Sequence, residues 1–171
     1  MSDAGYQPLR LQPADAGRLQ VLLDRCSDYY ELHEGCATPA DAGSYELSAV
    51  PDGRAASELH VIGLRTPAGT LDAVMQVLPN YPLPDVWWLC LLVVAPDLRG
   101  RGLGRVLFQH TLETATVAGT TELQLAVSLR NPRAQKFWRA VGFRETGRVS
   151  EVTARNGHID TACIMSRDLR A

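Results

Sequence analysis

The chain has 171 residues, of which 46% are hydrophobic and 21% are charged. This balance is typical of one globular domain with a full hydrophobic core. The formal net charge is only −2, and the basic residues are scattered, which argues against the broad positive face that nucleic-acid binding requires. No apolar run reaches the roughly 18 residues of a membrane span, and Met1–Arg10 lacks the pattern of a secretory leader. We therefore expect a single cytoplasmic domain over residues 1–171 that binds neither nucleic acid nor a membrane.

The cysteines and histidines do not indicate a metal site. The four cysteines show no C-x-x-C spacing, so neither a zinc site nor a disulfide framework is expected. His60, His110 and His158 are dispersed along the chain, and no pair has the spacing of metal ligands. We expect free thiols, a reducing compartment and no metal.

The first half of the chain alternates strand and helix patterns. Gln7–Leu11 predicts a strand, and the segment that begins at Pro13 predicts a helix with leucines at helical spacing. Thr38-Pro39 predicts a further helix, with threonine as the N-cap and proline in the first turn. The apolar runs Leu59–Leu64 and Leu71–Leu78 flank a short turn and together predict an antiparallel hairpin.

The pattern changes in the middle of the chain. Almost every residue of Val86–Ala95 is apolar, which is typical of a strand that is buried on both faces. Within it, the adjacent Trp87 and Trp88 must point to opposite faces of the sheet, so at most one of them can face a ligand. The glycine-rich turn Arg99–Gly104 follows, and after it a helical pattern ends at Gly119. The sequence thus predicts a strand, a glycine loop and a helix in succession.

The last third of the chain continues the alternation. Leu123–Val127 predicts a strand, and Asn131-Pro132 starts a helix that ends at Gly142. Two further strands flank Asn156-Gly157, a dipeptide that favours a tight type I′ turn. These strands are expected at Phe143–Thr153 and Ile159–Met165. We predict an α/β fold of the α+β kind, a mixed sheet of six to seven strands with about four helices packed on it.

The glycine loop is the main candidate for ligand binding. Gly100, Gly102 and Gly104 free the backbone of Cβ atoms just before a helix, so several N–H groups can converge on one anion. The helix dipole adds to that attraction. A carboxylate fits this argument as well as a phosphate does, and a glycine-rich turn can also serve tight packing alone.

The spacing of the loop separates it from two common phosphate loops. It is neither G-x-G-x-x-G nor G-x-x-x-x-G-K-[ST], which argues against dinucleotide-binding and P-loop proteins. Arg99–Gly104 instead resembles R/Q-x-x-G-x-G/A, the acetyl-CoA motif of the GNAT superfamily of N-acetyltransferases. The resemblance continues downstream with the family pattern N-x-x-A-x-x-F-[YW]-x-x-x-G-F, which is matched by Asn131, Ala134, Phe137, Gly142 and Phe143.

The resemblance implies a single-domain GNAT fold in which acetyl-CoA lies between two splayed central strands. It implies that the backbone of Leu92, Val93 and Val94 pairs with the pantetheine arm, and that the Val93 N–H stabilises the oxyanion. The remaining residues that it assigns to acetyl-CoA are Arg99, Gly100, Arg101, Gly102, Leu103, Gly104 and Arg105 at the pyrophosphate, Asn131 at the arm, and Phe137 and Trp138 at the thioester end.

The resemblance leaves the acid and the base of the reaction open. Many relatives place a proton-donating tyrosine where Trp138 stands, so water, Tyr30 or Tyr81 must supply that proton here. Val86–Ala95 also lacks the glutamate that some relatives carry. The candidate bases are Glu31, His33, Glu34 and Asp85, acting directly or through water.

The missing glutamate bears on the acceptor. Deprotonation at neutral pH costs roughly 4 to 5 kcal/mol for a lysine-like amine but only about 1 kcal/mol for an α-amine. The sequence therefore favours an α-amino group or a small-molecule amine.

The expected function is transfer of an acetyl group from acetyl-CoA to an amine of a small molecule or peptide, by direct attack in a ternary complex. Homodimers are common in the family, and a homodimer is expected here. An alternative hypothesis is a protein of the same fold that binds acyl-CoA without catalysis, as a sensor or a partner-binding module. A third hypothesis is a binding module for another phosphorylated ligand.

Overall fold

The computed structural model describes residues 5–170, and their core is one mixed sheet of seven strands in the order β1-β2-β3-β4-β5-β7-β6. The strands are β1 (Gln7–Arg10), β2 (His60–Arg65), β3 (Leu71–Leu78), β4 (Val86–Val94), β5 (Glu122–Ser128), β6 (Arg144–Thr153) and β7 (Ile159–Asp168). The helices are α1 (Ala16–Arg25), α2 (Ser27–Glu34), α3 (Ala42–Glu46), α4 (Leu103–Val117) and α5 (Pro132–Ala140). Neighbouring strands are antiparallel except β4 and β5, which are parallel.

This architecture confirms the predicted fold class, with five α-helices in place of about four. Residues 1–4 and 171, the ends of the predicted domain, lie outside the described residues. Within the described part of the chain, no helix is both long enough and apolar enough to cross a membrane.

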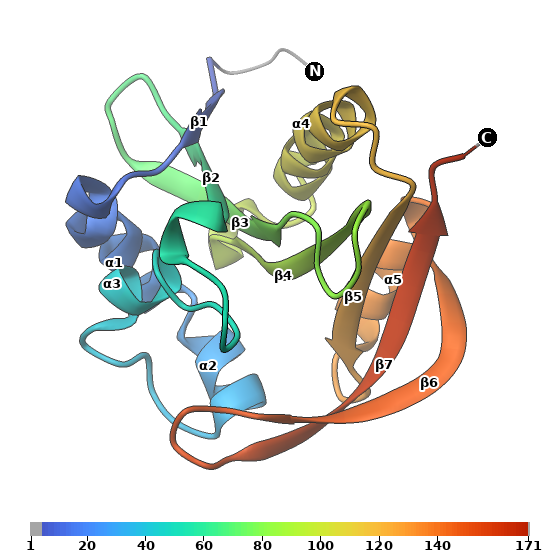
Figure 1. Ribbon diagram of the computed structural model, residues 1–171. Helices are drawn as coiled ribbons and strands as arrows, with labels where there is room; N and C mark the ends of the chain where they lie inside the picture. The colour runs from blue at the N-terminus through green and yellow to red at the C-terminus, as the bar shows by residue number, and fades with distance from the viewer. Residues whose placement is uncertain (1–4, 171) are drawn as a thin grey trace.

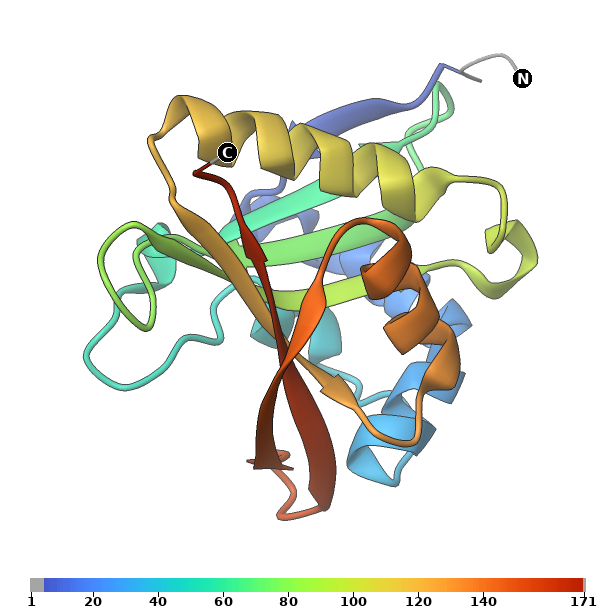
Figure 2. The same ribbon diagram turned by 90° about the vertical axis from the view of Figure 1, so that its right-hand side faces the viewer.

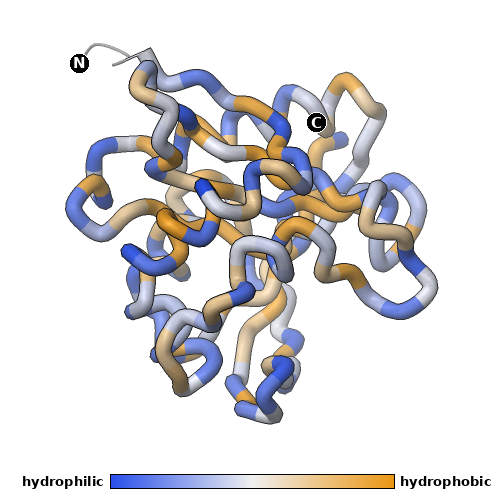
Figure 3. Tube along the Cα trace, turned by 90° about the vertical axis from the view of Figure 1, so that its left-hand side faces the viewer, coloured by the Kyte–Doolittle hydropathy of each residue, from blue (hydrophilic) through white to orange (hydrophobic). Residues whose placement is uncertain are grey.

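Helices cover both faces of the sheet and bury a separate core on each. Leu107 and Phe108 of α4 and Trp138 of α5 belong to one core. Leu22 of α1 and Tyr30 of α2 belong to the other, together with part of α3. Figures 1 and 2 show α4 and α5 on the face opposite to α1, α2 and α3. Along the trace in Figure 3, apolar stretches gather in the central strands and polar stretches at the outer loops. The sheet is therefore the middle layer of three.

An irregularity in β4 divides the sheet at its centre. Leu89 pairs with Val77 and Leu91 pairs with Gln76 of β3, so Cys90 is an extra, unpaired residue on β4. Because side chains alternate along a strand, one inserted residue exchanges the two faces for the rest of the strand. Leu89 accordingly lies in the core under α4, whereas Leu91 lies in the core under α1.

The parallel pairing of β4 with β5 ends at the same place. Its last pair is Leu89 with Leu125, and no later residue of β4 pairs with β5 within the described structure. Beyond it, β5 continues beside β7 as far as Ser128. Figure 1 shows β4 and β5 diverging from this point. The backbone edge of β4 after Cys90 is therefore free to pair with a ligand.

Two predicted turns differ from the structure. Thr38 does not cap a helix: its hydroxyl donates to the Leu23 carbonyl at 3.2 Å, and α3 begins only at Ala42. Asn156-Gly157 does not form a type I′ turn either, because that turn requires positive φ at both residues and only Gly157 has it, at 86°.

The hairpin between β6 and β7 instead has a glycine bulge. The Gly157 N–H donates to the Ala154 carbonyl at 2.9 Å, and the Ala154 N–H donates to the His158 carbonyl at 2.8 Å. This is the pattern of a three-residue loop that ends in a left-handed glycine. The Asn156 amide donates to the Glu34 carbonyl at 2.9 Å, so a tertiary contact holds the tip of the hairpin against α2.

Candidate active site

The glycine loop meets the N-terminus of α4 in a conformation that favours glycine. Gly100 and Gly102 have φ angles of 82° and 90°, in the left-handed region that side chains disfavour. A Cβ atom at either position would find no heavy atom within 4 Å. Gly102 is the N-cap of α4 and no side chain caps that end, so the first N–H groups of the helix are available to a ligand. Together with the helix dipole, the loop can bind an anion.

Beside the loop lies a cavity of about 500 Å³, here called the loop cavity. Its walls come from the end of β4, the glycine loop, the first turn of α4, α5 and part of α2. All the residues expected to bind the cofactor line it except Arg101. The structure thus brings together residues that are spread over three separate segments of the sequence.

The Arg99 side chain is held inside the protein rather than left free in the loop. Its guanidinium forms an ion pair with Asp28 of α2, with 2.9 Å between Nη2 and Oδ1, and its Nε donates to the Val94 carbonyl at 2.9 Å. The hydrogen bond from Arg99 holds the pKa of Asp28 below its ordinary value. Arg99 therefore ties the end of β4 to α2 and shapes the wall of the loop cavity.

Two other arginines supply positive charge to the loop cavity. Arg105 lines it, as expected from the sequence, and so does Arg133 in the first turn of α5. Sequence reasoning missed Arg133, although it lies two residues after Asn131, which belongs to the family pattern. Both guanidinium groups can make charge-assisted contacts to a phosphate.

The direction of the β4 backbone argues against the expected role of the Val93 N–H. The Ala95 N–H donates to the Asp72 carbonyl of β3 at 2.9 Å, and Val93 pairs with Val74 of β3. Because backbone groups alternate along a strand, the Val93 N–H points toward β3 as well. The N–H groups of Leu92 and Val94 point to the open edge instead.

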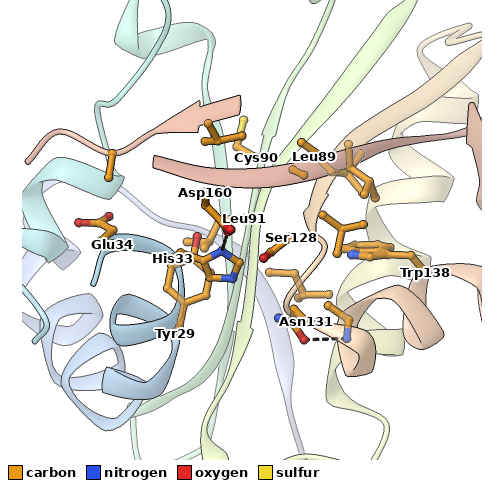
Figure 4. Close-up of a pocket in the computed structure, with 18 of the residues that line it drawn as sticks. Tyr29, His33, Glu34, Leu89, Cys90, Leu91, Ser128, Asn131, Trp138 and Asp160 are labelled. Carbon is orange, nitrogen blue, oxygen red and sulfur yellow. Dashed lines mark hydrogen bonds and ion pairs between the residues drawn. The ribbon is translucent and has the colours of Figure 1, made fainter. Parts of the chain in front are cut away.

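A second cavity, of about 300 Å³, lies in the gap between β4 and β5 and is here called the cleft cavity. Its walls come from the diverging parts of these strands, from α2 and from the hairpin of β6 and β7 (Figure 4). The residues that line both cavities are Tyr29, Leu92, Asn131, Ala134 and Trp138. The two cavities therefore meet at the free edge of β4.

Comparison with known proteins identifies the family. Residues 25–143, more than half of the chain, match the family model described as the acetyltransferase (GNAT) family. The chain belongs to the GNAT family of acetyltransferases. Members of this family use acetyl-CoA as the acetyl donor.

Individual relatives match either part of the chain or its whole fold. A peptidyl-lysine N-acetyltransferase, YjaB from Escherichia coli K12, is 46% identical over 61 residues, which cover 36% of this chain and 37% of that protein. A ribosomal protein bS18 alanine N-acetyltransferase from Salmonella typhimurium LT2 is 36% identical over 76 residues, or 44% of this chain and 51% of that protein. The chain thus spans about half or less of these two relatives. The solved structure of a GCN5-related N-acetyltransferase from Kribbella flavida is 25% identical, with a TM-score of 0.71 over 98% of this chain and 100% of that one.

Neither of the two predicted tyrosines lines the loop cavity or the cleft cavity. Tyr30 is 1% exposed in the core, and its hydroxyl donates to the buried Glu46 carboxylate at 3.2 Å. Tyr81 packs edge-on against Trp88, with 6.3 Å between the ring centroids. Tyr29, one residue earlier on α2, lines both cavities instead.

The candidate bases are also separated by the structure. His33 and Glu34 line the cleft cavity. Glu31 is exposed on α2 and Asp85 is exposed before β4, and neither lines either cavity. These two carboxylates therefore lie outside both cavities.

Asp160 on β7 is the functional candidate that sequence reasoning missed. It is 5% exposed, and its Oδ2 lies 3.2 Å from His33 Nδ1 (Figure 4). Its Oδ1 accepts from Arg130 Nε at 3.2 Å. Burial alone raises the pKa of Asp160, but hydrogen bonds from Ser128, Arg130 and His33 outweigh it and hold the pKa below its ordinary value. Asp160 and His33 are 127 positions apart in the sequence, so no local pattern reveals this contact.

The remaining family positions have structural partners as well. The Asn131 side chain accepts from the Ala134 N–H at 3.0 Å and so caps α5, which leaves its amide N–H groups for a ligand. Trp138 is 7% exposed and packs edge-on against Phe108 and Phe143. Trp87 likewise lies in the core under α4, whereas Trp88 lines the cleft cavity, as alternation predicts for these neighbours.

In the described residues, no group of three or more histidine, cysteine and acidic side chains is placed to hold a metal ion.

Proposed function

We propose that this protein transfers the acetyl group of acetyl-CoA to a primary amine by direct attack in a ternary complex. The observation that carries the proposal is the meeting of two cavities at the free edge of β4. One cavity has an anion-binding loop, and the other has polar side chains that can handle protons. A thioester between them can be reached by an amine from the opposite side.

The loop cavity fits acetyl-CoA by the chemistry of its lining. The N–H groups around Gly100 and Gly102 and the guanidinium groups of Arg105 and Arg133 suit the pyrophosphate. The free edge of β4 at Leu92 and Val94 suits the amide groups of the pantetheine arm. Phe137 and Trp138 add apolar surface at the junction with the cleft cavity.

Two groups are proposed for the acyl-transfer step in place of those expected from the sequence. The Leu92 N–H, on the open edge of β4, replaces the Val93 N–H as the donor to the thioester oxygen. Tyr29 replaces Tyr30 and Tyr81 as the proton donor to the leaving thiolate, because its side chain reaches the junction of the two cavities. Burial raises the pKa of Tyr29, so its phenol is protonated and able to donate at neutral pH.

The proposed acceptor is a primary amine at the end of a peptide or on a small molecule. The two partial relatives act on a peptidyl lysine and on a ribosomal-protein alanine, as their names state. The cleft cavity, at about 300 Å³, has room for one side chain or chain end. An α-amine is favoured because it loses its proton more readily than a lysine does.

The test is acetyl-CoA-dependent release of free thiol with two peptides. One carries a free N-terminal alanine, and the other is N-acetylated and carries a single lysine. We expect thiol release with the alanine peptide to exceed that with the lysine peptide, with one acetyl group added to the α-amine by mass spectrometry. The Gly102→Asp variant is the matched control and should release little thiol with either peptide.

A second candidate function is an acyl-CoA sensor or partner-binding module on the same fold. The observation that favours it is Trp138, which is buried in the aromatic cluster where many relatives have a tyrosine. A protein that binds acetyl-CoA but releases no thiol with a broad amine panel would support this function. Competition of acetyl-CoA by nucleotides would instead support a module for another phosphorylated ligand.

The location and assembly of the protein are also proposals. A cytoplasmic location is supported by four free cysteines, which suit a reducing compartment. A homodimer is supported by the edge strand β6, all of whose residues are exposed, with Val149 61% and Val152 45% exposed. Light scattering after size-exclusion chromatography gives the mass that decides between one copy and two.

A further inference from the structure

We propose that His33, oriented by Asp160, accepts the proton of the amine that enters the cleft cavity. The proposal rests on the acetyl-transfer function proposed above and assigns the base that the sequence leaves open. It makes His33 a catalytic residue and Asp160 a positioning residue.

The geometry of the pair suits this role. His33 lies on α2 and Asp160 on β7; both line the cleft cavity, with 3.2 Å between Nδ1 and Oδ2. Since a carboxylate can only accept, this contact places the proton of neutral His33 on Nδ1 and leaves Nε2 with its lone pair. Within residues 5–170, Nε2 has no hydrogen-bond partner. The imidazole therefore presents a free base to the cavity (Figure 4).

The Asp160 carboxylate is itself held in place by hydrogen bonds. Its Oδ1 accepts from Arg130 Nε at 3.2 Å and from the Thr161 N–H at 2.9 Å. Arg130 also donates to the Leu32 carbonyl on α2. The loop after β5, the strand β7 and the helix α2 thus hold the carboxylate from three directions, which fixes the imidazole that it orients.

The surroundings of His33 favour its neutral form near pH 7. Burial lowers its pKa, and the nearby Arg130 charge acts in the same direction, while Asp160 opposes both. The other titratable side chains that line the same cavity are Tyr29, Glu34 and Cys90. The net direction is downward, so the imidazole is neutral at pH 7 and can accept a proton.

The other acidic side chains of α2 are less well placed. Figure 4 shows the Glu34 carboxylate on the side of His33 away from Trp138, and so away from the junction of the two cavities. His33, by contrast, packs against Tyr29, which lines both cavities, with 4.5 Å between the ring centroids.

The proposed step balances in atoms and charge. The amine nitrogen forms a bond to the thioester carbon, and the carbon–sulfur bond breaks with its electron pair on sulfur. The surplus amine proton moves to His33 Nε2, and the thiolate takes a proton from the Tyr29 hydroxyl. Proton transfer from His33 to the Tyr29 phenolate, directly or through water, restores both groups.

The first test needs no knowledge of the acceptor, because it uses chloroacetyl-CoA. The electrophilic methylene of this reagent lies next to the thioester carbonyl, so a nucleophile that reaches the acceptor position displaces chloride and becomes alkylated. The test uses the Cys90→Ser protein, since the Cys90 thiol lines the same cavity and would compete. We expect peptide mass spectrometry to find the adduct on His33, at a rate that rises with pH as His33 loses its proton.

A matched control is His60→Gln in the same background. His60 is also a half-buried histidine whose pKa is lowered by burial, but it packs edge-on against Trp87 and lines neither cavity. Labelling should be unchanged in this variant and lost in His33→Gln. Absence of a His33 adduct from a protein that still binds acetyl-CoA overturns the proposal. Failure to bind acetyl-CoA at all would instead refute the proposed function.

The second test addresses Asp160 through NMR titration of His33. Removal of the carboxylate in Asp160→Asn should lower the pKa of His33 further, because Asp160 is the group that raises it. The rate of labelling at high pH should fall by about tenfold or more, since the imidazole loses its fixed tautomer and orientation. An unchanged His33 pKa and labelling rate would show that Asp160 does not orient the base.

Discussion

The backbone of Gly102 belongs to the loop that is proposed to bind the pyrophosphate of acetyl-CoA. Gly102 has a φ of 90°, caps α4 and faces open space. In Gly102→Asp, a carboxylate lies where the pyrophosphate is expected, so we predict at least about tenfold weaker binding of acetyl-CoA, or about 1.4 kcal/mol. Isothermal titration calorimetry measures the effect.

Two controls separate charge from backbone strain at this position. Gly102→Ala carries similar strain without the charge and should weaken binding less. Gly53 also has a positive φ, of 82°, with no heavy atom near its Cβ position, but it lies far from the glycine loop in sequence and lines neither cavity. Equal affinity in Gly102→Asp and Gly53→Asp would rule out the loop as the phosphate site.

Tyr29 is predicted to affect turnover but not stability. Its ring lies at the junction of the cavities and its hydroxyl has no hydrogen-bond partner within residues 5–170. In Tyr29→Phe we expect the rate of thiol release to fall about 10²-fold or more, the usual contribution of a positioned proton donor. Acetyl-CoA affinity and the free energy of unfolding should change little. Wild-type turnover in this variant would indicate that water, not Tyr29, protonates the leaving thiolate.

Tyr30 is predicted to show the opposite behaviour. Its buried hydroxyl donates to Glu46, whose other carboxylate oxygen accepts from Gln76 at 2.7 Å. Tyr30→Phe leaves a buried acceptor less satisfied, so denaturant unfolding should show a loss of about 1 to 3 kcal/mol. Thiol release per folded molecule should be preserved. A loss of turnover at unchanged stability would place Tyr30, not Tyr29, in the chemistry.

These neighbouring tyrosines also show what a sequence pattern can resolve at the scale of residues. The glycine loop and the Asn131 motif are local, and their side chains do gather at one site. Which tyrosine faces the cleft depends on the phase of α2, a helix with a mixed, weakly amphipathic sequence that starts only at Ser27. A rotation of α2 by one residue would exchange the core position of Tyr30 and the cleft position of Tyr29. The sequence does not determine that rotation.

At the scale of elements, the strands and helices themselves were largely predictable and the irregularities were not. The apolar run that contains β4 predicts a strand buried on both faces, but nothing in it marks Cys90 as the inserted residue. The bulge arises from the register between β3 and β4, which is a tertiary property. For the same reason Thr38, which fits the N-cap pattern, instead donates to a carbonyl of α1.

Asp160 links β7 to α2, and its contribution to stability should depend on pH. Its folded-state pKa is held below the ordinary value, so its stabilising effect is present above the ordinary pKa of about 3.9 and is lost as pH falls through the folded-state value. We expect Asp160→Asn to lower the free energy of unfolding by about 1 to 3 kcal/mol at pH 7. The difference from wild type should shrink as the pH is lowered below about 4, as followed by urea unfolding.

The matched control is the exposed ion pair between Asp41 and Arg155. The pKa of Asp41 is also lowered by its arginine, but its side chain is 69% exposed, so solvent and salt screen the pair. Asp41→Asn should leave stability nearly unchanged at every pH. If both variants lost the same free energy of unfolding, the contacts of Asp160 with His33 and Arg130 would stabilise the fold no more than the exposed ion pair does.

At the scale of the whole molecule, the division of the sheet between β4 and β5 is the feature that creates the site. On one side, β1 to β4 pack with α1 to α3; on the other, β5 to β7 form a second group of strands beside α5 (Figures 1 and 2). Within residues 5–170, the strand pairing between the two groups covers only Val86–Leu89 of β4. A ligand that lies along the free edge of β4 therefore contacts both groups and should stabilise the fold as a whole.

Thermal unfolding measures that stabilisation. At about a hundred times its dissociation constant, a ligand specific for the folded state adds about 2.7 kcal/mol, which corresponds to roughly 5 to 10 °C for a chain of this size. We expect this shift with acetyl-CoA and with CoA, because both carry the pyrophosphate and the pantetheine arm, but not with ATP, which lacks the arm. In Gly102→Asp the shift should be smaller at the same concentration. An equal shift with ATP would mean that the loop binds phosphate without any contact to the β4 edge. That result would favour the hypothesis of a binding module for another phosphorylated ligand.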